Sequence, residues 1–430
     1  MLRPTASLAA VLLAATVAAA AAPSASPDPK SLLVADGDQT RARELVQKLG
    51  SEQYAEREAA EQALAEMGRL ARAALLDAVN NDASPEVRTR CQGLLPRATS
   101  LEMKARLEVF LADTDGKFDH DLAGWTQFRE LVRTTHTVLG FPVRTDPALD
   151  GAARTMFAEL VASPANRHLL FAIGGQQAEL GSLAAARQQE LYSQKYPRAV
   201  FVAGGVVRPP AARRDPSLAD VVTLLLAQHQ AGASFVPPRS APISVLVTSA
   251  GLNQAINTGD ARGRVCRAVL TAWFETRQDP MDQYNAMTLA GNLGMPEVSC
   301  DLATRLLRNK AAVASYRSMA ATTLVRSGTK AHLPALEDAM DDKAVVFTVR
   351  RAAPGKPGEI EANEIQLRDL ALVVGLLITQ QNPTDYGFVD QYGKGVGAGG
   401  ANFNYTRFFI PEAKRDEAQA KWKEWRAKAP

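Results

Sequence analysis

The sequence predicts an all-α protein made of short helices that pack as stacked hairpins. Apolar residues recur at three- and four-residue steps near the start of the chain, as in Ala60, Leu64 and Met67, and charged residues fill the positions between them. Helix start and stop signals separate such stretches at short intervals. A helix–Gly–helix–Asp pattern at 60–82 returns at 320–342. Together these observations indicate a repeated helical hairpin.

Residues 1–22 are predicted to be a secretory signal peptide. Arg3 precedes an apolar, alanine-rich run that ends in small residues. An uncleaved membrane anchor is the alternative, but the run is short for a membrane span. Export predicts a periplasmic or secreted protein. Residues 23–38, which begin PSASPDPKS, are expected to be a Pro/Ser linker.

Residues 39–112 are expected to form the first group of hairpins. Gly68 follows an apolar stripe and is placed to end a helix in a left-handed conformation. Ser84 is a good N-cap, and Pro85 falls in the first helical turn, where its missing N–H has no cost. SPEVRTRCQGLL therefore begins another short helix, of about 12 residues, the length usual in globular proteins.

The rest of the chain divides by the regularity of its helical pattern. Residues 113–258 are expected to be an irregular helical region with a long loop at 199–217, and 259–343 a second group of hairpins. β-Branched runs around a Pro-Gly cluster predict a β-hairpin insertion at 344–368. Residues 369–430 are expected to hold helices, a glycine-rich loop at 391–405 and a terminal capping helix.

The recurrence of the hairpin can be aligned without a gap. The residues that match are Ala60 with Ala320, Leu64 with Leu324, Gly68 with Gly328, Ala71 with Ala331, Leu76 with Leu336, and Asp82 with Asp342. Stacked units would leave such a trace, although two ordinary hairpins can also converge on some of these matches.

LGSEQYAEREAAEQALAEMG followed by SPEVRTRC resembles the HEAT repeat, whose second helix typically begins with a Pro/Glu-Val-Arg pattern. The Pro-Glu-Val part of this helix start returns at Pro296-Glu297-Val298. The resemblance to the HEAT repeat extends over 41–97 and 281–342, and more loosely over 260–275. The stretches at 120–132, 153–161 and 368–388 are similar to exported bacterial HEAT-like proteins of unassigned activity. The resemblance implies an alpha-alpha superhelix with a long concave surface that holds proteins or extended chains.

The charge balance and the motif content exclude several function classes. Lys plus Arg (49) nearly equals Asp plus Glu (46), which gives no basic surface for nucleic acid. The five histidines, at 120, 136, 168, 229 and 332, show no metal-ligand spacing, and HExxH, CxxC and GxSxG motifs are absent from the sequence. GKGVGAGG lacks the Gly-Lys-Ser/Thr ending of a phosphate loop. No catalytic, cofactor-binding or metal residue is assigned, and no cofactor is expected.

DTDGKFDHD (113–121) superficially resembles a calcium loop. With Gly116 at the required glycine, Asp113 and Asp115 take the third and fifth ligand positions. Leu111 and Leu122 would then occupy the first and last positions, which need oxygen ligands, so a solvated turn between helices is favoured. If the middle region holds an enzyme site, its candidate residues are Asp119, His120, Asp121 and Trp125.

Cysteines, arginines and tryptophans each have a structural interpretation. Cys266 and Cys300 lie about one helical repeat apart, so a disulfide is conceivable. Buried free thiols are the favoured interpretation for them and for Cys91. The resemblance implies that Arg57, Arg88 and Arg317 brace neighbouring turns. Trp422 and Trp425, in KWKEWR, are expected to cap the last repeat; membrane-surface contact is the less favoured alternative.

The sequence as a whole predicts an exported, non-enzymatic helical-repeat scaffold that binds a protein partner of unknown identity in the cell envelope. Two alternatives stay open. One is an enzyme, or an accessory subunit of one, with its site in the middle region, and the other is a structural component of the envelope.

Overall fold

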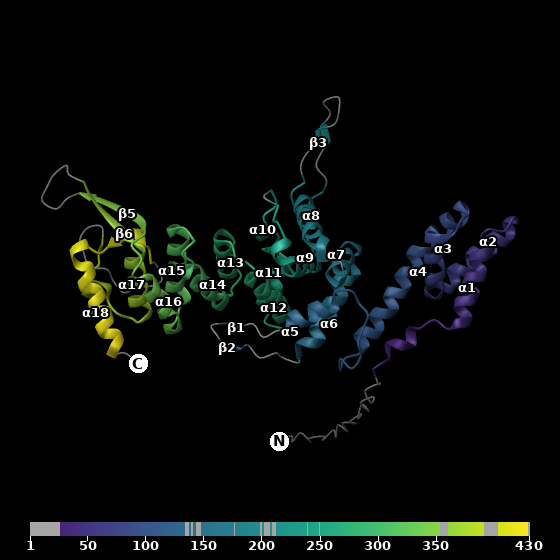
Figure 1. Ribbon diagram of the computed structural model, residues 1–430, viewed down its shortest axis with the longest axis horizontal. Coiled ribbons are helices and arrows are strands. Elements are labelled where there is room, and N and C mark those ends of the chain that lie inside the picture. Colours follow the sequence, from purple (N-terminus) through teal and green to yellow (C-terminus); the bar gives the residue numbers. More distant parts are fainter. Residues whose placement is uncertain are drawn as a thin grey trace, which may run out of the picture. The chain divides into compact units, whose positions relative to one another are not determined.

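The computed structural model describes residues 26–133, 137–138, 141–142, 148–175, 177–197, 200–201, 207–208, 212–238, 240–248, 250–352, 360–390 and 403–428. The chain forms two compact units, Met1–His120 and Asp121–Pro430. Both units are built mainly of α-helices, and the described strands pair into short two-stranded sheets in the second unit (Figure 1). The predicted all-α class is therefore confirmed. The expected signal peptide at 1–22 lies outside the described residues.

In the described part of the first unit, which starts at residue 26, the α-helices are α1 (Asp36–Lys48), α2 (Tyr54–Met67), α3 (Arg72–Asn81) and α4 (Pro85–Ala112). Helices α1 and α4 each pack on both α2 and α3, and together they bury one apolar core, which consists of Ala42, Val46, Leu49, Ala60, Leu64, Ala71, Leu75, Ala78, Val87, Cys91 and Ala98. The linker was predicted over 23–38, but a short 3₁₀ helix (Pro29–Leu32) and the start of α1 lie within this range. The predicted linker is therefore too long. Two aspartates in the first turn of α1 favour that start through the helix dipole.

The predicted helix end and helix start in this unit are confirmed, but the backbone of Gly68 lies outside the left-handed helical region expected for it. Helix α2 ends at Met67, and Gly68 has φ +55° and ψ −117°, a conformation that side chains disfavour. A Cβ atom on Gly68 would also lie 2.9 Å from Cδ1 of Leu101. Ser84 caps α4, because its Oγ accepts a hydrogen bond from the N–H of Val87 at 3.4 Å.

The short helix expected after Ser84 is wrong in length. Helix α4 has 28 residues and continues through Pro96. A proline inside a helix removes one hydrogen bond and costs about 3 kcal/mol. Burial on both sides of the proline opposes this cost, since Cys91 and Ala98 lie in the core and Phe110 is fully buried.

The middle region of the second unit is organised around α9 (Leu218–Ala231), whose residues 221–228 are all buried. The helices packed on α9 are α6 (Ala148–Ala162), α7 (Pro164–Gly175), α8 (Gln177–Lys195), α11 (Ala250–Asn257) and α12 (Ala261–Glu275). Helix α5 (Trp125–Arg133) packs on α6, α7 and α12. Helix α12, assigned by sequence to the second group of hairpins, thus also belongs to the core of the middle region.

Short strands and one further helix complete this region. They are β1 (Thr137–Val138), β2 (Phe141–Pro142), β3 (Val200–Phe201), β4 (Val207–Arg208) and α10 (Ile243–Val247). Strands β3 and β4 pair antiparallel within the loop expected at 199–217, of which residues 199, 202–206 and 209–211 lie outside the described part.

The next four helices form two layers: α13 (Pro280–Asn292), α14 (Pro296–Arg308), α15 (Ala314–Ser327) and α16 (Leu333–Ala339). Helices α13 and α15 pack on each other in one layer, and α14 and α16 in the other, while α14 also packs on α13 and α15. We call these four helices the α13–α16 block.

The recurring hairpin is present in both units, but the gap-free alignment is wrong after its turn. Both copies consist of a helix, a 3₁₀ turn and a second helix: α2, Gly68–Ala71 and α3, then α15, Lys330–His332 and α16. Four residues join the helices of the first copy, and five (328–332) join those of the second.

The buried positions of the two hairpin copies match only when this one-residue insertion is taken into account. Before the turn, the buried Leu64 corresponds to the buried Leu324, as aligned. After the turn, the buried Leu75 corresponds to Leu336, since the aligned Leu76 is 37% exposed. Ala331, aligned with the buried Ala71, is likewise exposed. The insertion shifts every later position by one residue.

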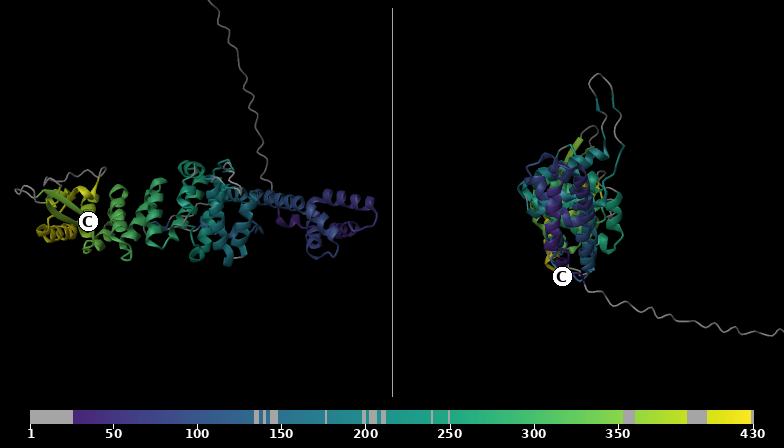
Figure 2. Two further views of the ribbon diagram at one scale, coloured as in Figure 1. Left: turned by 90° about the horizontal axis from the view of Figure 1, so that it is seen from above. Right: turned by 90° about the vertical axis from the view of Figure 1, so that its right-hand side faces the viewer.

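The C-terminal part begins with the predicted β-hairpin. Strands β5 (Val345–Ala352) and β6 (Ile360–Gln366) pair antiparallel with a bulge near Val345, which confirms the expected insertion. One side of this ribbon packs Val349 and Ile365 against Phe409 of a second ribbon, formed by β7 (Val389–Asp390) and β8 (Phe408–Phe409). The hairpin lies beside the C-terminal helices drawn in yellow (Figure 2). Residues 391–402 of the expected glycine loop lie outside the described residues.

The last two helices are α17 (Leu367–Ile378) and α18 (Arg415–Lys428). Trp422 of α18 is buried and lies against α17, so close that a Cβ on Gly375 would lie 3.1 Å from its ring. Trp425 contacts the Trp422 ring at 5.1 Å between centroids. Helix α18 therefore covers α17 with Trp422, and Trp425 packs on the Trp422 ring.

Candidate functional site

The acidic loop at 113–121 uses its first aspartate to fix its own backbone. Asp113 is fully buried, and its carboxylate accepts hydrogen bonds from the N–H groups of Lys117 (2.9 Å) and Phe118 (3.1 Å). Nε2 of His120 lies 2.9 Å from Oδ2 of the same carboxylate. The expected turn is present, but its central carboxylate is not solvated. No group of three or more potential metal ligands occurs among the described residues.

The four candidate residues for an enzyme site lie in different structural environments. His120 belongs to the first unit, where its ring packs edge-on against Phe110 at 5.2 Å. Trp125 belongs to the core of the second unit, where its ring lies 5.2 Å from that of Phe157. Asp119 and Asp121 are exposed.

The three cysteines are buried, unbonded thiols. Burial raises the pKa of Cys91 and Cys300 to about 11 and that of Cys266 to about 12. Because the thiolate is the nucleophile, such thiols are unreactive near neutral pH. The conceivable Cys266–Cys300 disulfide is not formed, and the favoured interpretation is confirmed.

The three arginines brace turns, as the resemblance implied. Arg57 donates hydrogen bonds to the carbonyl oxygens of Ser51 (2.8 Å) and Glu52 (3.2 Å). Arg88 does the same at the same spacing, to Asp82 (2.5 Å) and Ala83 (3.1 Å).

Arg317, in the second unit, is buried and also donates to a carbonyl oxygen that precedes its helix. Its Nε donates to the carbonyl oxygen of Leu307 at 2.9 Å, and its Nη1 pairs with Asp342. All three guanidinium groups thus satisfy carbonyl groups that precede the helix carrying the arginine.

A chain of buried amides crosses the middle region. Gln188 on α8 donates to the carbonyl oxygen of Ala241 at 2.5 Å, and Gln228 on α9 donates to Oε1 of Gln188 at 2.6 Å. Trp273 on α12 completes the chain by donating to Oε1 of Gln228 at 2.8 Å. This network was not predicted from the sequence, although glutamines inside apolar helices such as LLLAQHQ were a signal. Its satisfied groups hold three helices in register and offer no reactive atom.

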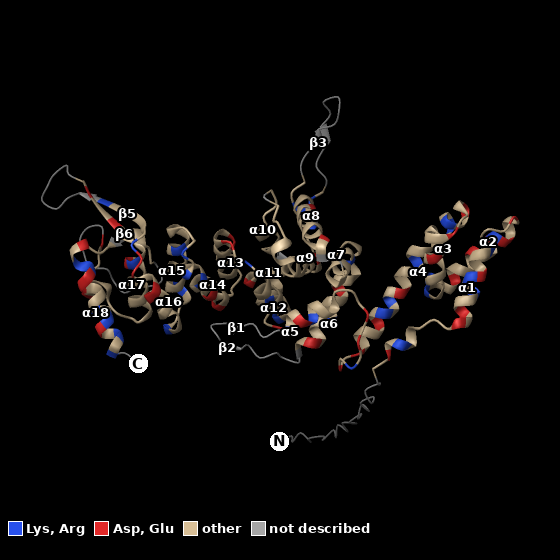
Figure 3. Ribbon diagram, viewed as in Figure 1, with Lys and Arg blue, Asp and Glu red and all other residues tan. Residues whose placement is uncertain are grey.

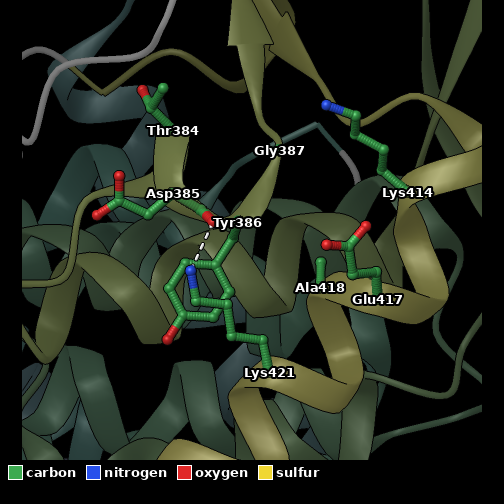
Figure 4. A pocket seen from close by; sticks show the side chains of 8 residues that line it. All are labelled: Thr384, Asp385, Tyr386, Gly387, Lys414, Glu417, Ala418 and Lys421. Carbon is green, nitrogen blue, oxygen red and sulfur yellow. Dashed lines mark hydrogen bonds between the residues drawn. The ribbon is translucent and has the colours of Figure 1, made fainter.

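A small polar cavity of about 130 Å³ lies between α18 and the 3₁₀ helix Pro383–Tyr386. Figure 4 shows its lining, which consists of Thr384, Asp385, Tyr386, Gly387, Lys414, Glu417, Ala418 and Lys421. Nζ of Lys421 donates to the carbonyl oxygen of Asp385 at 2.8 Å and lies 4.8 Å from the centre of the Tyr386 ring. Lys421 therefore fastens α18 to the 3₁₀ helix, and the cavity holds no nucleophile paired with a base.

A second cavity, of about 290 Å³, lies between α1 and α3 in the first unit. Alanine and leucine make much of its wall, with Arg43 and Asp77 at its polar positions. Gln39 is a third polar residue of this wall, so the lining is mixed.

One layer of the α13–α16 block carries many charges. Arg308 of α14 pairs with Asp338 of α16 at 2.8 Å, and Glu337 of α16 pairs with Arg426 of α18 at 3.0 Å. Arg305 lies 2.6 Å from Asp301, whose pKa burial raises. Figure 3 shows charged residues along α14, α16 and α18, and we call this surface the charged face.

The other layer is almost free of charge. Residues 283–292 of α13 contain no charged residue, and in 314–325 of α15 the only one is Arg317, which points inward. Met281 and Met319 are 54% and 39% exposed there. Tyr284 of α13 stacks on Tyr316 of α15 with 5.1 Å between ring centroids and 15° between planes. We call this surface the neutral face.

In comparisons with known proteins, no protein-family model, curated protein or solved structure matches the chain. In the part of the chain that the structure describes, no helix is long and apolar enough to cross a membrane.

Proposed function

We propose that the protein is an exported helical-repeat scaffold that binds a protein partner in the cell envelope through the charged face. Its architecture would be an alpha-alpha superhelix of HEAT-like hairpins, in which second helices line the binding surface. The observation that carries the proposal is the pair of ion pairs that joins α14 to α16 and α16 to α18, since it links three helices that are not consecutive in the chain. Extended surfaces of this kind generally hold proteins or extended chains.

Two features favour a repeat relationship. The hairpins α2–α3 and α15–α16 share their order of helix, 3₁₀ turn and helix and, with one inserted residue, their buried positions. In the first unit, Arg57 and Arg88 brace the turns before their helices through carbonyl groups at identical spacing. Recurrence of both packing and bracing is what copies of one supersecondary unit are expected to retain.

The charged face has the chemistry of a selective protein surface. Several of its charged side chains are partly exposed, such as Arg305 at 40% and Asp338 at 60%. Charges at such positions steer association and reject unsuitable partners more than they add affinity. The location in the envelope follows from the signal peptide predicted at 1–22.

Affinity capture tests the proposal. A chain lacking residues 1–22 is immobilised, exposed to an envelope extract, and its bound proteins are identified by mass spectrometry. We expect a specific partner with the wild type and its loss with the double variant Arg305→Glu/Asp338→Lys. Each substitution removes one partly exposed ion pair, so the unfolding free energy should fall by about 1 kcal/mol or less for each, and urea unfolding of the variant checks this.

Thr155→Lys is the matched control, because Thr155 is exposed on α6 and lies outside the charged face. This variant should capture the partner as the wild type does. Retained capture by the double variant would remove the charged face from the proposal.

A further inference from the structure

The outer edge of β5 is the edge of this strand that does not pair with β6. Between the bulge near Val345 and Arg350, β5 has β-branched and aromatic side chains and no charge. Helix α15 and the 3₁₀ helix Tyr405–Arg407 also pack on β5. In the described part of the chain, however, no backbone hydrogen bond joins residues 346–350 to an element other than β6. The N–H and C=O groups on the outer edge are therefore free to pair with another chain.

The other edge of the ribbon, on β6, is occupied. Strand β8 packs on β6, and Nη2 of Arg415 donates to the carbonyl oxygen of Glu364 at 2.5 Å. The buried ion pair between Arg415 and Asp369 holds this guanidinium in place. The outer edge of β5 is therefore the edge that is left for a third strand.

The charges of the ribbon are divided between its two strands. Strand β5 carries Arg350 and Arg351 and no acidic residue, whereas β6 carries Glu361 and Glu364 and no basic residue. In the register of the ribbon, Arg351 lies opposite Glu361, but Arg350 lies opposite Ala362. Arg350 is exposed and forms no ion pair with a described residue. The β5 side of the ribbon is therefore basic at this end.

The start of β5 gives no comparable charge. Asp341 and Lys343, which precede the strand, are both exposed and offset each other. Asp342 pairs with Arg317 of α15. Complementarity along this edge is therefore decided at Arg350.

We propose that the outer edge of β5 binds an extended acidic segment of another protein, which adds to the ribbon as a third, antiparallel strand. The main chain of the segment pairs with the free backbone groups, and its alternate side chains give specificity. Apolar side chains lie beside Phe347 and Val349, and polar ones beside the exposed Thr348 and Arg350. An acidic residue opposite Arg350 supplies the carboxylate that β6 does not.

A second copy of the chain fits this edge less well. Pairing of two β5 strands joins two basic strands, because β5 has no acidic residue. Pairing of β5 with β6 of another copy would match the charges, but Arg415 occupies the β6 edge. Contact at the strand edge goes beyond the proposed scaffold function, because it lies outside the charged face and recognises a main chain.

Fluorescence anisotropy of a labelled peptide tests the proposal. The probe is the heptapeptide TEVTVTT, acetylated at its N-terminus and labelled with fluorescein at its C-terminus. Antiparallel pairing aligns its glutamate with Arg350 and its valines with Val349 and Phe347. We expect the wild type to bind this probe with a dissociation constant of about 100 μM or lower.

Two further peptides test the pairing of main chains. Both have the sequence of the probe and are N-methylated on alternate residues, one on the odd and the other on the even positions. In an added strand, the N–H groups of alternate residues face the neighbouring strand. One peptide should therefore lose at least about tenfold in affinity, while the other binds like the probe.

Substitution of Arg350 tests the place of binding. Arg350→Glu should weaken binding of TEVTVTT about fivefold or more, and it should strengthen binding of TKVTVTT, because the cross-strand charge pair is reversed. Arg41→Glu is the matched control, since Arg41 is exposed on α1 in the first unit. This control should bind both peptides like the wild type, and circular dichroism checks that each variant is folded.

Three results would overturn the proposal: a wild type that does not bind the probe, equal binding of the two N-methylated peptides, or unchanged binding by Arg350→Glu. A dimer of the chain that the probe dissociates, seen by sedimentation velocity, would instead assign the edge to a second copy. Arg350→Glu should still capture the envelope partner, and Arg305→Glu/Asp338→Lys should still bind the probe. Failure of the strand-edge contact is therefore distinguishable from failure of the charged face.

Discussion

Arg415 and Asp369 form a buried ion pair that joins the start of α18 to the start of α17, with Nη2 of the arginine 3.1 Å from Oδ2 of the aspartate. Their side chains are 6% and 4% exposed. The arginine also donates to the carbonyl oxygen of Glu364 at 2.5 Å, and Gln366 donates its N–H to Oδ2 of Asp369 at 3.0 Å. The pair thus connects the β-hairpin, α17 and α18.

Removal of Arg415 should strongly destabilise the second unit. Arg415→Ala leaves the Asp369 carboxylate buried without its ion-pair partner, which typically costs 3–5 kcal/mol, or about 4 kcal/mol here. Urea unfolding measures the change. The control is Arg426→Ala, whose pair with Glu337 is about one-third exposed and should contribute about 1 kcal/mol or less. Equal effects of the two variants would show that the burial of the Arg415 pair is unimportant.

Gly68→Ala should destabilise the first unit by more than about 1 kcal/mol. The alanine would take a disfavoured backbone conformation and place its Cβ 2.9 Å from Leu101. Gly93 provides the opposite case within α4, since no atom lies within 4 Å of a Cβ built there. Gly93→Ala should therefore stabilise the unit by about 0.5–1 kcal/mol, through helix propensity. Thermal unfolding of both variants checks the difference in sign.

Trp273→Phe should cost about 1–3 kcal/mol more than Trp422→Phe. Both indoles are buried, at 3% and 2% exposure, so the loss of ring volume is similar. Trp273 donates to the buried Oε1 of Gln228, whereas Nε1 of Trp422 has no hydrogen-bond partner among the described residues. Chemical denaturation of the two variants gives the comparison. A larger loss for Trp422→Phe would mean that packing outweighs the amide network.

Local chemistry was predictable from the sequence. Gly68 and Ser84 end and start helices because of their own backbone freedom and hydroxyl group, and neither property depends on distant residues. The β5–β6 hairpin was predictable for the same reason, since its β-branched runs flank a local turn signal.

Features set by tertiary packing were not predictable. Helix α4 passes through Pro96 because residues on both sides of it are buried, and no local rule contains that burial. The residue inserted before α16 became visible only from burial, because the gap-free alignment pairs the buried Leu336 with the exposed Leu76 and the exposed Ala331 with the buried Ala71.

The candidate surfaces depended even more on tertiary structure. The amide chain of Gln188, Gln228 and Trp273 joins residues from three helices that lie far apart in sequence. The neutral face required knowing that α13 and α15 are neighbours, although the uncharged stretches that form it can be seen in the sequence.

Acidification should remove a stabilising contribution from Asp342. Burial alone would raise the pKa of this carboxyl group, but the N–H of Ala344 and the guanidinium of Arg317 outweigh burial and hold the pKa below the usual value of 3.8. A pKa lowered by folding means that the ionised form stabilises the native state. This contribution is complete above about pH 5, and it decreases as the pH falls below 3.8 toward the lower native pKa.

The unfolding midpoint in urea, measured at intervals from pH 7 to about pH 2, should therefore fall less steeply for Asp342→Asn than for the wild type. The variant should be less stable than the wild type at pH 7 and approach it at the acidic end. Parallel curves for the two proteins would show that the carboxylate has no linkage to folding, and that Arg317 braces its turn through the carbonyl oxygen of Leu307 alone.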